Sequence, residues 1–326
     1  MSMSDPLSIW AVSDGRAGME NQALGLAEAV ARQRDAVITV KRLKVQKPFD
    51  GLPRWAWGDP EARLAGTSDT LALPLPDLWI ATGRRTIPFS LKMKGRGPFV
   101  VQTQDPRVPE GGFDLVVPPA HDMLRGANVF PILGSPNRLT EEQLSADAAT
   151  LEPFLPDLPR PLVTVLIGGT SKDYHLTEES LHDIIVRLRD LMASGVGLLI
   201  STSRRTGDEA LSKIRASLAG PRAYVWDGGS VGGLENPYLG MLGLGSRILV
   251  TEESANMLTD AAFTGKPVHL LPLKGGAPKW VRLHEALERH GVLRPRASYT
   301  DEWDYEPLRE TDRAAAEILG RMEDED

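Results

Sequence analysis

The feature that most constrains the fold is the steady alternation of short apolar runs with segments of helical period along the 326 residues. Between the runs, segments such as residues 23–30 repeat apolar side chains at the spacing of one helix face. This alternation predicts an α/β protein with parallel sheets. The predicted strands of the first half lie at residues 9–12, 36–40, 78–81, 99–102 and 115–117, and those of the second half at 162–167, 197–201, 223–226, 247–250 and 268–271.

The domain boundary is predicted in a proline-rich stretch, because prolines stiffen a connection between two folded parts. We expect an N-terminal Rossmann-like domain at residues 1–136, a linker at 137–161 and a C-terminal Rossmann-like domain at 162–326. The last helix, at residues 311–322, could pack back on the N-terminal domain. Residues 47–76 have no clear period and are expected to form an irregular excursion on the surface.

Composition narrows the class of protein. The net charge of −7 argues against nucleic-acid binding, which needs a basic surface. The chain has no cysteine, so disulfides, thiolate metal sites and cysteine nucleophiles are excluded, and a reducing cytoplasm is expected. No run approaches the roughly 18 apolar residues that a membrane span needs, and residues 1–7 lack the positive charge and apolar run of a signal peptide, so none is expected there. Peripheral contact with a membrane stays open.

Polar, glycine-rich loops follow the predicted strands of the first half. Ligands of open α/β sheets bind beyond the carboxyl ends of the strands, so these loops are the first places to search. Arginines can bind a phosphate or carboxylate with two hydrogen bonds, and an aspartate or histidine can act as a general base. Tight turns, helix caps and ordinary surface are the structural alternatives. The candidate residues are Asp14, Gly15, Arg16, Gly18, Asn21, Gln22, Arg84, Arg85, Gln104, Asp105 and His121.

Loops of the same kind follow the strands of the second half. Glycines, hydroxyl groups and a lysine or arginine are what a diphosphate needs, namely close amides, short donors and a positive charge. The spacings of a P-loop, of a dinucleotide fingerprint, of a serine nucleophile elbow and of a metal site are all missing. Ser254 could simply be a helix cap. The candidate segments are residues 168–172, 203–205, 227–229 and 252–260.

Five of these segments resemble the mitochondrial-fission Elm-type family. That family includes plant proteins that help to recruit a dynamin-related GTPase to mitochondria and many bacterial members of undefined function. The resemblance covers nearly the whole chain, and a bacterial member is expected because the first strand begins without an extension before it. The segments are SDGRAGMENQ at 13–22, QDPR at 104–107, GGTSK at 168–172, STSRR at 201–205 and EESANM at 252–257.

A second resemblance is to GT-B glycosyltransferases, in particular the N-acetylglucosaminyltransferase of lipid II synthesis. Residues 168–171 are similar to its Gly-Gly-Ser turn. Residues 253–267 are similar to its Ser-Gly-Ala-Leu-Thr loop, ribose-binding glutamate and Gly-x-Pro, with Asp260 in place of the glutamate and Ser254 in place of the loop glycine. The resemblance implies two Rossmann-like domains facing each other across a cleft, with the acceptor on the N-terminal one and the nucleotide sugar on the C-terminal one.

The resemblance therefore implies a metal-independent glycosyltransferase that uses a nucleotide sugar as substrate and has no other cofactor. Asp14 would be the base, with Asp105 and His121 as second choices. The acceptor would contact Gly15, Arg16, Gly18, Asn21, Gln22, Arg84, Arg85 and Gln104. The nucleotide and its phosphates would contact Gly168, Gly169, Thr170, Ser171, Lys172, Ser203, Arg204, Arg205, Glu253, Ser254, Ala255, Asn256, Met257 and Asp260, the last through the ribose.

Two other functions compete with this one. The first is a non-catalytic adaptor of the Elm-type family that binds a partner protein. An adaptor should carry its unusual residues on exposed convex faces, whereas here they gather in strand-end loops. The second is an oxidoreductase that holds the 2′-phosphate of NADP with Lys41 and Arg42, which the missing fingerprint disfavours.

Overall fold

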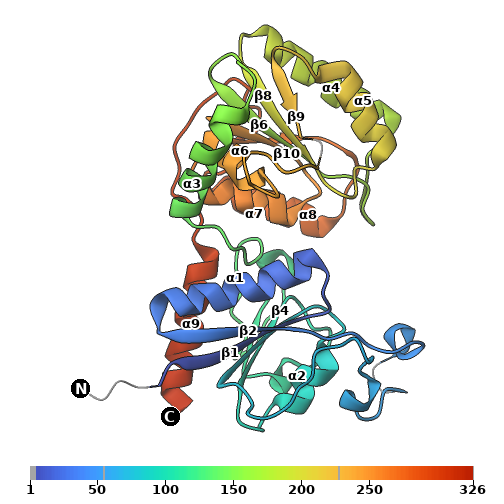
Figure 1. Ribbon diagram of the computed structural model, residues 1–326, viewed down its shortest axis with the longest axis vertical. Helices are drawn as coiled ribbons and strands as arrows, with labels where there is room; N and C mark the ends of the chain where they lie inside the picture. The colour runs from blue at the N-terminus through green and yellow to red at the C-terminus, as the bar shows by residue number, and fades with distance from the viewer. Residues whose placement is uncertain (1–4, 54–55, 227, 326) are drawn as a thin grey trace. The chain divides into compact units, whose positions relative to one another are not determined.

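The computed structural model describes residues 5–53, 56–226 and 228–325, so that Asp227 lies outside the described residues. The chain divides into unit 1, made of Met1–Arg138 and Arg309–Asp326, and unit 2, made of Leu139–Leu308 (Figure 1). Each unit is built on a five-stranded sheet whose neighbouring strands are parallel. The predicted α/β class with two parallel sheets is confirmed.

The sheet of unit 1 has the strand order β2-β1-β3-β4-β5. After β1 the chain adds one strand on one side and the next strand on the other, so the topological switch point lies between β1 and β3. The strands are β1 (Leu7–Ser13), β2 (Ala36–Arg42), β3 (Leu78–Thr82), β4 (Phe99–Thr103) and β5 (Leu115–Val117). The helices are α1 (Ala17–Gln33), α2 (Ile87–Met93) and α9 (Glu310–Glu325).

Both faces of this sheet are buried, because successive side chains of a strand point to opposite faces. In β1, Ile9 and Ala11 belong to one core cluster with residues of α1 and α9, whereas Trp10 and Val12 belong to another with residues of α2. Trp57, only 3% exposed, joins the second cluster. Residues 47–76 are irregular, as expected, but they do not lie wholly on the surface, since Trp57 supplies part of the core.

The sheet of unit 2 has the order β11-β10-β6-β8-β9, and its switch point lies between β6 and β10. Its strands are β6 (Leu162–Ile167), β8 (Gly197–Thr202), β9 (Ala223–Val225), β10 (Arg247–Thr251) and β11 (Val268–Leu271). A small antiparallel sheet pairs β7 (Tyr174–His175) with β12 (Lys274–Gly275). The helices are α4 (Glu178–Ala193), α5 (Asp208–Leu218), α6 (Tyr238–Leu244), α7 (Ala255–Phe263) and α8 (Pro278–His290).

Helix α3 (Glu141–Leu151) lies in the stretch predicted as a linker and packs against α6 in unit 2. Glycines on α6 allow the close approach, because a Cβ at Gly240 would lie 2.7 Å from the carbonyl oxygen of Asp147. The last helix, α9, packs against α1 within unit 1. Short 3-10 turns complete the fold: η1 (Phe49–Gly51), η3 (Glu61–Arg63), η4 (Glu110–Gly112), η5 (Ala120–Asp122) and η6 (Glu152–Phe154). No helix within the described ranges is long and apolar enough to cross a membrane.

Candidate functional site

The switch point of unit 1 carries a buried carboxylate held by an arginine. Asp14 follows β1, and its side chain is 1% exposed. Arg16 donates from Nε to both carboxylate oxygens, at 3.1 and 2.8 Å, and one of its terminal nitrogens lies 2.7 Å from Oδ2. Arg85, which follows β3, lies 3.9 Å from the same oxygen. The two loops that flank the switch point therefore meet at Asp14.

The remaining acceptor-side candidates lie along the same edge of the sheet. Gln104, after β4, donates from Nε2 to Oε1 of Gln22 on α1 at 2.8 Å, so this pair ties the loop to the helix. Asn21 is exposed on the same helix, Gly18 lies in its first turn, and Gly15 has a φ of 79°. The left-handed φ of Gly15 explains a glycine at that turn.

The other two candidates for the base lie in separate loops. Asp105 accepts a hydrogen bond on Oδ1 from the backbone N–H of Arg107 at 2.8 Å and is partly exposed. His121 lies in η5 after β5 and is buried, with Nε2 4.0 Å from a carboxylate oxygen of Asp122. The arginines Arg16, Arg84 and Arg85 gather on one cavity of about 690 Å³.

The switch point of unit 2 also carries a buried carboxylate, Glu253, whose side chain is fully buried. Its Oε1 accepts from the N–H of Gly169 at 2.7 Å, and the N–H of Gly168 donates to Oγ1 of Thr251 at 2.8 Å. A Cβ on Gly168 would overlap Oε1 of Glu253, and one on Gly169 would overlap the backbone carbonyl of Arg205. These glycines are therefore required by close packing, and their amides serve the fold.

The loop after β8 is fastened to the same place. Arg205 lies 3.1 Å from Oε1 of Glu253, while the backbone N–H of Arg205 donates to Oγ of Ser203 at 3.1 Å. The hydroxyl of Thr206 shares its one hydrogen between the carbonyls of Ile167 and Gly168, joining the loops after β6 and β8. Arg204 is exposed and pairs with no atom of the residues that the structure describes.

Several donor groups at the start of α7 have no hydrogen-bond partner among the residues that the structure describes. Ser254 occupies the N-cap position, yet its hydroxyl makes no cap hydrogen bond and the residue is only 7% exposed. Within the described ranges, the amides of Ala255 and Met257 donate to no other protein group, and the same holds for the amides of Thr170 and Lys172 after β6. Free amides at a helix start favour an anion.

The two hydroxyl groups of the loop after β6 accept hydrogen bonds from backbone amides nearby. Oγ1 of Thr170 accepts from the N–H of Leu176 at 3.2 Å, and Oγ of Ser171 accepts from the N–H of Tyr174 at 3.1 Å. Next to them, Asp173 binds the ammonium group of Lys279 at 2.8 Å. The loop is thus fixed on the small sheet of β7 and β12, and Lys172 is exposed at its tip.

Asp260 lies in the second turn of α7 and has an unusual protonation. The hydroxyl of Tyr238 donates to its Oδ2 at 3.0 Å. Burial raises the pKa of Asp260 to about 7, which outweighs the lowering effect of that hydrogen bond. Because a strongly shifted pKa in a strand-end region marks a candidate functional group, Asp260 keeps its place in the predicted site. Asn256, also on α7, is exposed.

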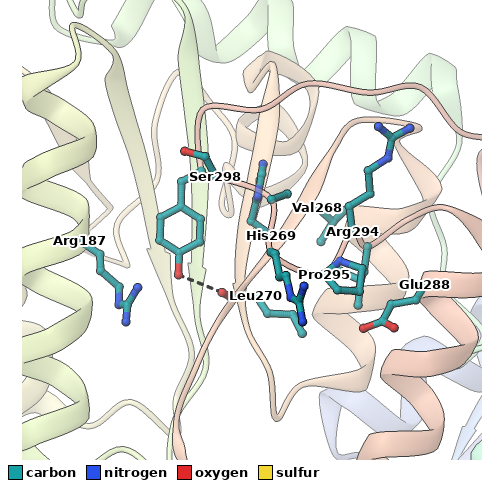
Figure 2. A pocket seen from close by; sticks show the side chains of 12 residues that line it. Arg187, Val268, His269, Leu270, Glu288, Arg294, Pro295 and Ser298 are labelled. Atoms are coloured by element: carbon teal, nitrogen blue, oxygen red, sulfur yellow. Dashed lines mark hydrogen bonds between the residues drawn. The ribbon is translucent and has the colours of Figure 1, made fainter.

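Unit 2 also contains a cavity of about 460 Å³ that sequence reasoning did not anticipate (Figure 2). It lies beside the start of β11, and Arg187 from α4, His269 from β11 and Glu288 from α8 line it. The ring of His269 meets the ring of Trp303 edge-on at 4.9 Å, and its burial lowers the pKa of His269 to about 4. His269 is therefore neutral at pH 7, as expected of a core histidine.

No group of three histidine, aspartate or glutamate side chains suited to a metal ion occurs among residues 5–53, 56–226 and 228–325. A metal-independent reaction stays a prediction.

Sequence comparison supplies the family. The profile of the family described as "Mitochondrial fission ELM1" matches residues 17–322. The chain belongs to this family. Among relatives of this ELM1-family chain, the mitochondrial fission protein ELM1 of Arabidopsis thaliana is 27% identical over 273 residues, covering 74% of this chain and 63% of the plant protein. The chain thus spans less than two thirds of that relative. The uncharacterized protein RP120 of Rickettsia prowazekii is 25% identical over 356 residues, covering 96% and 98%.

Two solved structures share the fold of this ELM1-family chain. The co-structure of S. aureus MnaA with UDP has a TM-score of 0.53 at 12% identity, covering 97% of this chain and 89% of that one. The ADP-heptose LPS heptosyltransferase II of E. coli has a TM-score of 0.51 at 13% identity, covering 98% and 99%. At such low identity the comparison shows the fold alone. The predicted GT-B-like fold is confirmed, and the arrangement of the two units across a cleft stays a prediction.

Several residues that shape these sites were missed by sequence reasoning. Thr251 and Thr206 fix the glycine turn of unit 2, and the serine three residues before Thr206 is the sequence signal that could have pointed to that turn. Asp50, Leu52 and Trp57 line the cavity of unit 1, but they come from the stretch without periodicity, so no pattern could have placed them there.

Proposed function

We propose that this protein is a glycosyltransferase that moves a sugar from a nucleotide sugar to an acceptor hydroxyl. The observation that carries the proposal is the start of α7, at the switch point of unit 2. The hydroxyl of Ser254 and the amides of Ala255 and Met257 have no partner there among the residues described. One of the two similar solved structures contains UDP and the other is an ADP-heptose LPS heptosyltransferase, which supports a nucleoside diphosphate as part of the ligand.

The diphosphate would be held by groups that the fold has left unused. The amides at the start of α7 and those of Thr170 and Lys172 point to anion binding without a metal. The exposed guanidinium group of Arg204 would add a positive charge. Arg205 would contribute less than predicted from the sequence, because Glu253 already binds it at 3.1 Å. Asp260 would accept hydrogen bonds from the ribose hydroxyls.

In the reaction, the acceptor hydroxyl oxygen forms a bond to the anomeric carbon while the bond from that carbon to the diphosphate oxygen breaks. The nucleoside diphosphate leaves with the electron pair of that bond. Its developing negative charge would be stabilised by the amides and the hydroxyl group at the start of α7, which are fixed in place before the reaction begins. The proton of the acceptor hydroxyl passes to a base on the acceptor side.

The contacts favour Asp105 as this base over Asp14. Both oxygens of Asp14 already accept hydrogen bonds from Arg16, so its lone pairs are engaged. Asp105 has one oxygen, Oδ2, without a hydrogen bond to the described protein, and its side chain is partly exposed. We expect Asp105→Asn to lower the turnover rate about 100-fold, the typical contribution of a positioned base. His121→Gln in the same assay would test the third candidate.

Calorimetry with UDP, ADP and their sugar derivatives tests the donor site. We expect at least one of them to bind, and we expect Arg204→Ala to weaken binding about tenfold, or ~1.4 kcal/mol. Arg222→Ala, which changes an arginine of the same unit that donates to the carbonyl of Met192, is the matched control. If none of these nucleotides binds and Lys172→Ala changes no cellular glycan, the proposal is wrong.

The raised pKa of Asp260 gives a second test through pH. Its carboxyl group is largely protonated below pH 6 and ionised above pH 8, because the pKa lies at about 7. Only the ionised form accepts hydrogen bonds from two ribose hydroxyls with both oxygens. Nucleotide affinity should therefore rise across this interval and should lose that rise in Asp260→Asn. Equal pH profiles for the two proteins would remove Asp260 from the ribose site.

The family itself supports a second candidate function, a non-catalytic adaptor that binds a partner protein. The plant relative is named a mitochondrial fission protein, and its match covers 74% of this chain. An adaptor would retain its cellular role in variants that cannot bind nucleotide. Complementation of a deletion strain by Arg204→Ala and by Ser254→Ala would therefore favour the adaptor, whereas failure of both with normal protein levels would favour the enzyme.

A further inference from the structure

The cavity of about 690 Å³ in unit 1 opens at the switch point between β1 and β3. Its volume lies in the range of cavities that hold small-molecule ligands. Three arginines, Arg16, Arg84 and Arg85, line one part of it, and Leu52, Trp57 and Val108 line another. The cavity thus combines a cationic side with an apolar side.

Two of the arginines are held in fixed positions. Asp14 binds Arg16 through both carboxylate oxygens and lies near Arg85, while Asp50 lies 3.5 Å from the other end of the Arg85 guanidinium group. The side chains of Arg16 and Arg85 nevertheless remain 62% and 43% exposed. Because the protein already holds both side chains in place, they lose little conformational entropy when they donate further hydrogen bonds to a ligand.

The charges of this cluster do not cancel. Three guanidinium groups face two carboxylates, those of Asp14 and Asp50. Arg84 is exposed and makes no ion pair with any described residue, so it supplies the unbalanced charge. A planar guanidinium group binds a phosphate or carboxylate with two parallel hydrogen bonds. The cationic side therefore suits an anionic group of the ligand.

The apolar side is equally well fixed. Trp57 donates from its indole nitrogen to the carbonyl of Leu52 at 3.2 Å, and its ring meets that of Phe89 edge-on at 6.3 Å. Leu52 leaves 42% of its surface exposed beside this ring. Exposed apolar surface next to cationic groups favours a ligand that carries an apolar body next to its negative charge.

We propose that this cavity binds an anionic amphiphile, a molecule with a phosphate or carboxylate group on an apolar body. Arg84, together with Arg16 and Arg85, binds the anionic group, and Leu52, Trp57 and Val108 contact the apolar body. The inference rests on the proposed function in one respect only, which is that this molecule is the sugar acceptor. The binding itself needs no glycosyl transfer.

Calorimetry with octyl phosphate, octanol and inorganic phosphate tests the proposal on the full chain. Octyl phosphate should bind at least tenfold more tightly than either of the others, because only it reaches both sides of the cavity. Arg84→Gln should weaken its binding about tenfold, and Leu52→Asn should weaken it while leaving inorganic phosphate unaffected. Arg125→Gln, an exposed arginine of the same unit outside the cavity, is the matched control.

The outcomes are distinct. Equal binding of octyl phosphate and octanol, or wild-type binding by Arg84→Gln with an unchanged melting temperature, overturns the proposal. Vesicles of phosphatidic acid in phosphatidylcholine identify the source: Arg84-dependent co-sedimentation assigns the ligand to a lipid headgroup, and its absence, with octyl phosphate bound, to a soluble molecule. Nucleotide binding without octyl phosphate binding overturns this inference alone, and the reverse result overturns only the proposed function.

Discussion

The two units have a buried carboxylate at the switch point in common, but they differ in the groups that this carboxylate binds. Each places a buried carboxylate there, Asp14 in unit 1 and Glu253 in unit 2, and each pairs it with an arginine that stays exposed. In unit 1 both carboxylate oxygens bind Arg16. In unit 2 one oxygen binds Gly169 and Arg205, while Oε2 has no hydrogen-bond partner in the described part of the chain.

This difference separates two kinds of binding surface. The Asp14 carboxylate fixes arginine side chains, so unit 1 presents guanidinium groups on a cavity with an apolar side. The Glu253 carboxylate binds the amide of Gly169 and fixes a glycine turn, and the groups that unit 2 presents are the amides of Ala255 and Met257 and the Ser254 hydroxyl. Side-chain cations suit ligands of varied shape, whereas backbone amides at the start of a helix suit one anion in one position.

The largest expected effect is that of filling the space at the glycine turn of unit 2. Gly168→Ala would place a methyl group on the Glu253 carboxylate, which is fully buried and bound by Gly169 and Arg205, and we expect a loss of about 3 kcal/mol in the free energy of unfolding. A Cβ at Gly15 in unit 1 would make only ordinary contact with the Arg42 side chain at 3.9 Å, so Gly15→Ala should cost only the strain of the left-handed φ, about 1 kcal/mol. Urea unfolding measures both.

Gly66→Ala is the control for this comparison, since Gly66 has neither a close neighbour nor a left-handed φ. It should change the free energy of unfolding by less than ~0.5 kcal/mol. If Gly168→Ala and Gly15→Ala cost the same, the glycine turn of unit 2 is not tightly packed, and the contrast between the two switch points fails.

Acid should destabilise unit 2 through His269. The pKa of His269 is lowered from 6.5 to about 4, chiefly by burial, so the folded state holds the neutral form. The contribution of neutral His269 to the free energy of unfolding is complete above pH 6.5. As the pH falls from 6.5 to 4, the free energy of unfolding decreases by about 3 kcal/mol. Burial also lowers the pKa of His284, which adds to the loss in the same direction.

His269→Phe keeps an aromatic ring beside Trp303 and removes the titration. Urea unfolding at several pH values should then show a shallower loss of stability between pH 6.5 and 4 than in the wild type. Parallel curves for the two proteins would mean that His269 does not titrate in this range. They would also assign the acid sensitivity of unit 2 to other groups.

Removing a threonine hydroxyl that links neighbouring segments should cost more stability in unit 2 than in unit 1. The hydroxyl of Thr206 accepts from the N–H of Ser203 at 3.0 Å and shares its one hydrogen between two carbonyls, so Thr206→Val should cost about 2 kcal/mol in unit 2. Thr103 shares a single hydrogen bond with Thr82 at 2.6 Å in unit 1, so Thr103→Val should cost about 1 kcal/mol. Thermal unfolding of both variants checks the order, and equal losses would contradict it.

The sequence predicted the sheets well because parallel strands buried on both faces leave unmistakable apolar runs. The strand from Leu162 to Ile167 appears in the structure with the predicted bounds. Residues 47–76 escaped prediction because their core residue, Trp57, is held by contacts to Leu52 and Phe89 that follow no helical or strand period. Tertiary packing alone determines that stretch.

The loops that carry the candidate sites could be predicted from the sequence, but the hydrogen-bond partners of their residues could not. Strand-end loops could be read from the chain, yet strand order, which defines the switch points, depends on long-range pairing such as that of β6 with β10. The sequence also could not show that the amides of Gly168 and Gly169 would be used by Thr251 and Glu253, because those residues lie more than 80 positions away. The roles of the predicted site residues stay predictions.

Replacing the exposed arginines Arg84 and Arg204 should have the smallest effect on stability, and it tests the contrast between the units most directly. Arg84 in unit 1 and Arg204 in unit 2 are exposed and pair with no described residue, so replacing either with alanine should change the free energy of unfolding by less than ~0.5 kcal/mol. Each should weaken one ligand about tenfold and spare the other: Arg84→Ala octyl phosphate, and Arg204→Ala the nucleotide. If either variant weakened both ligands equally, that arginine would not be specific to one ligand. The contrast between the two switch points would then lie in packing alone.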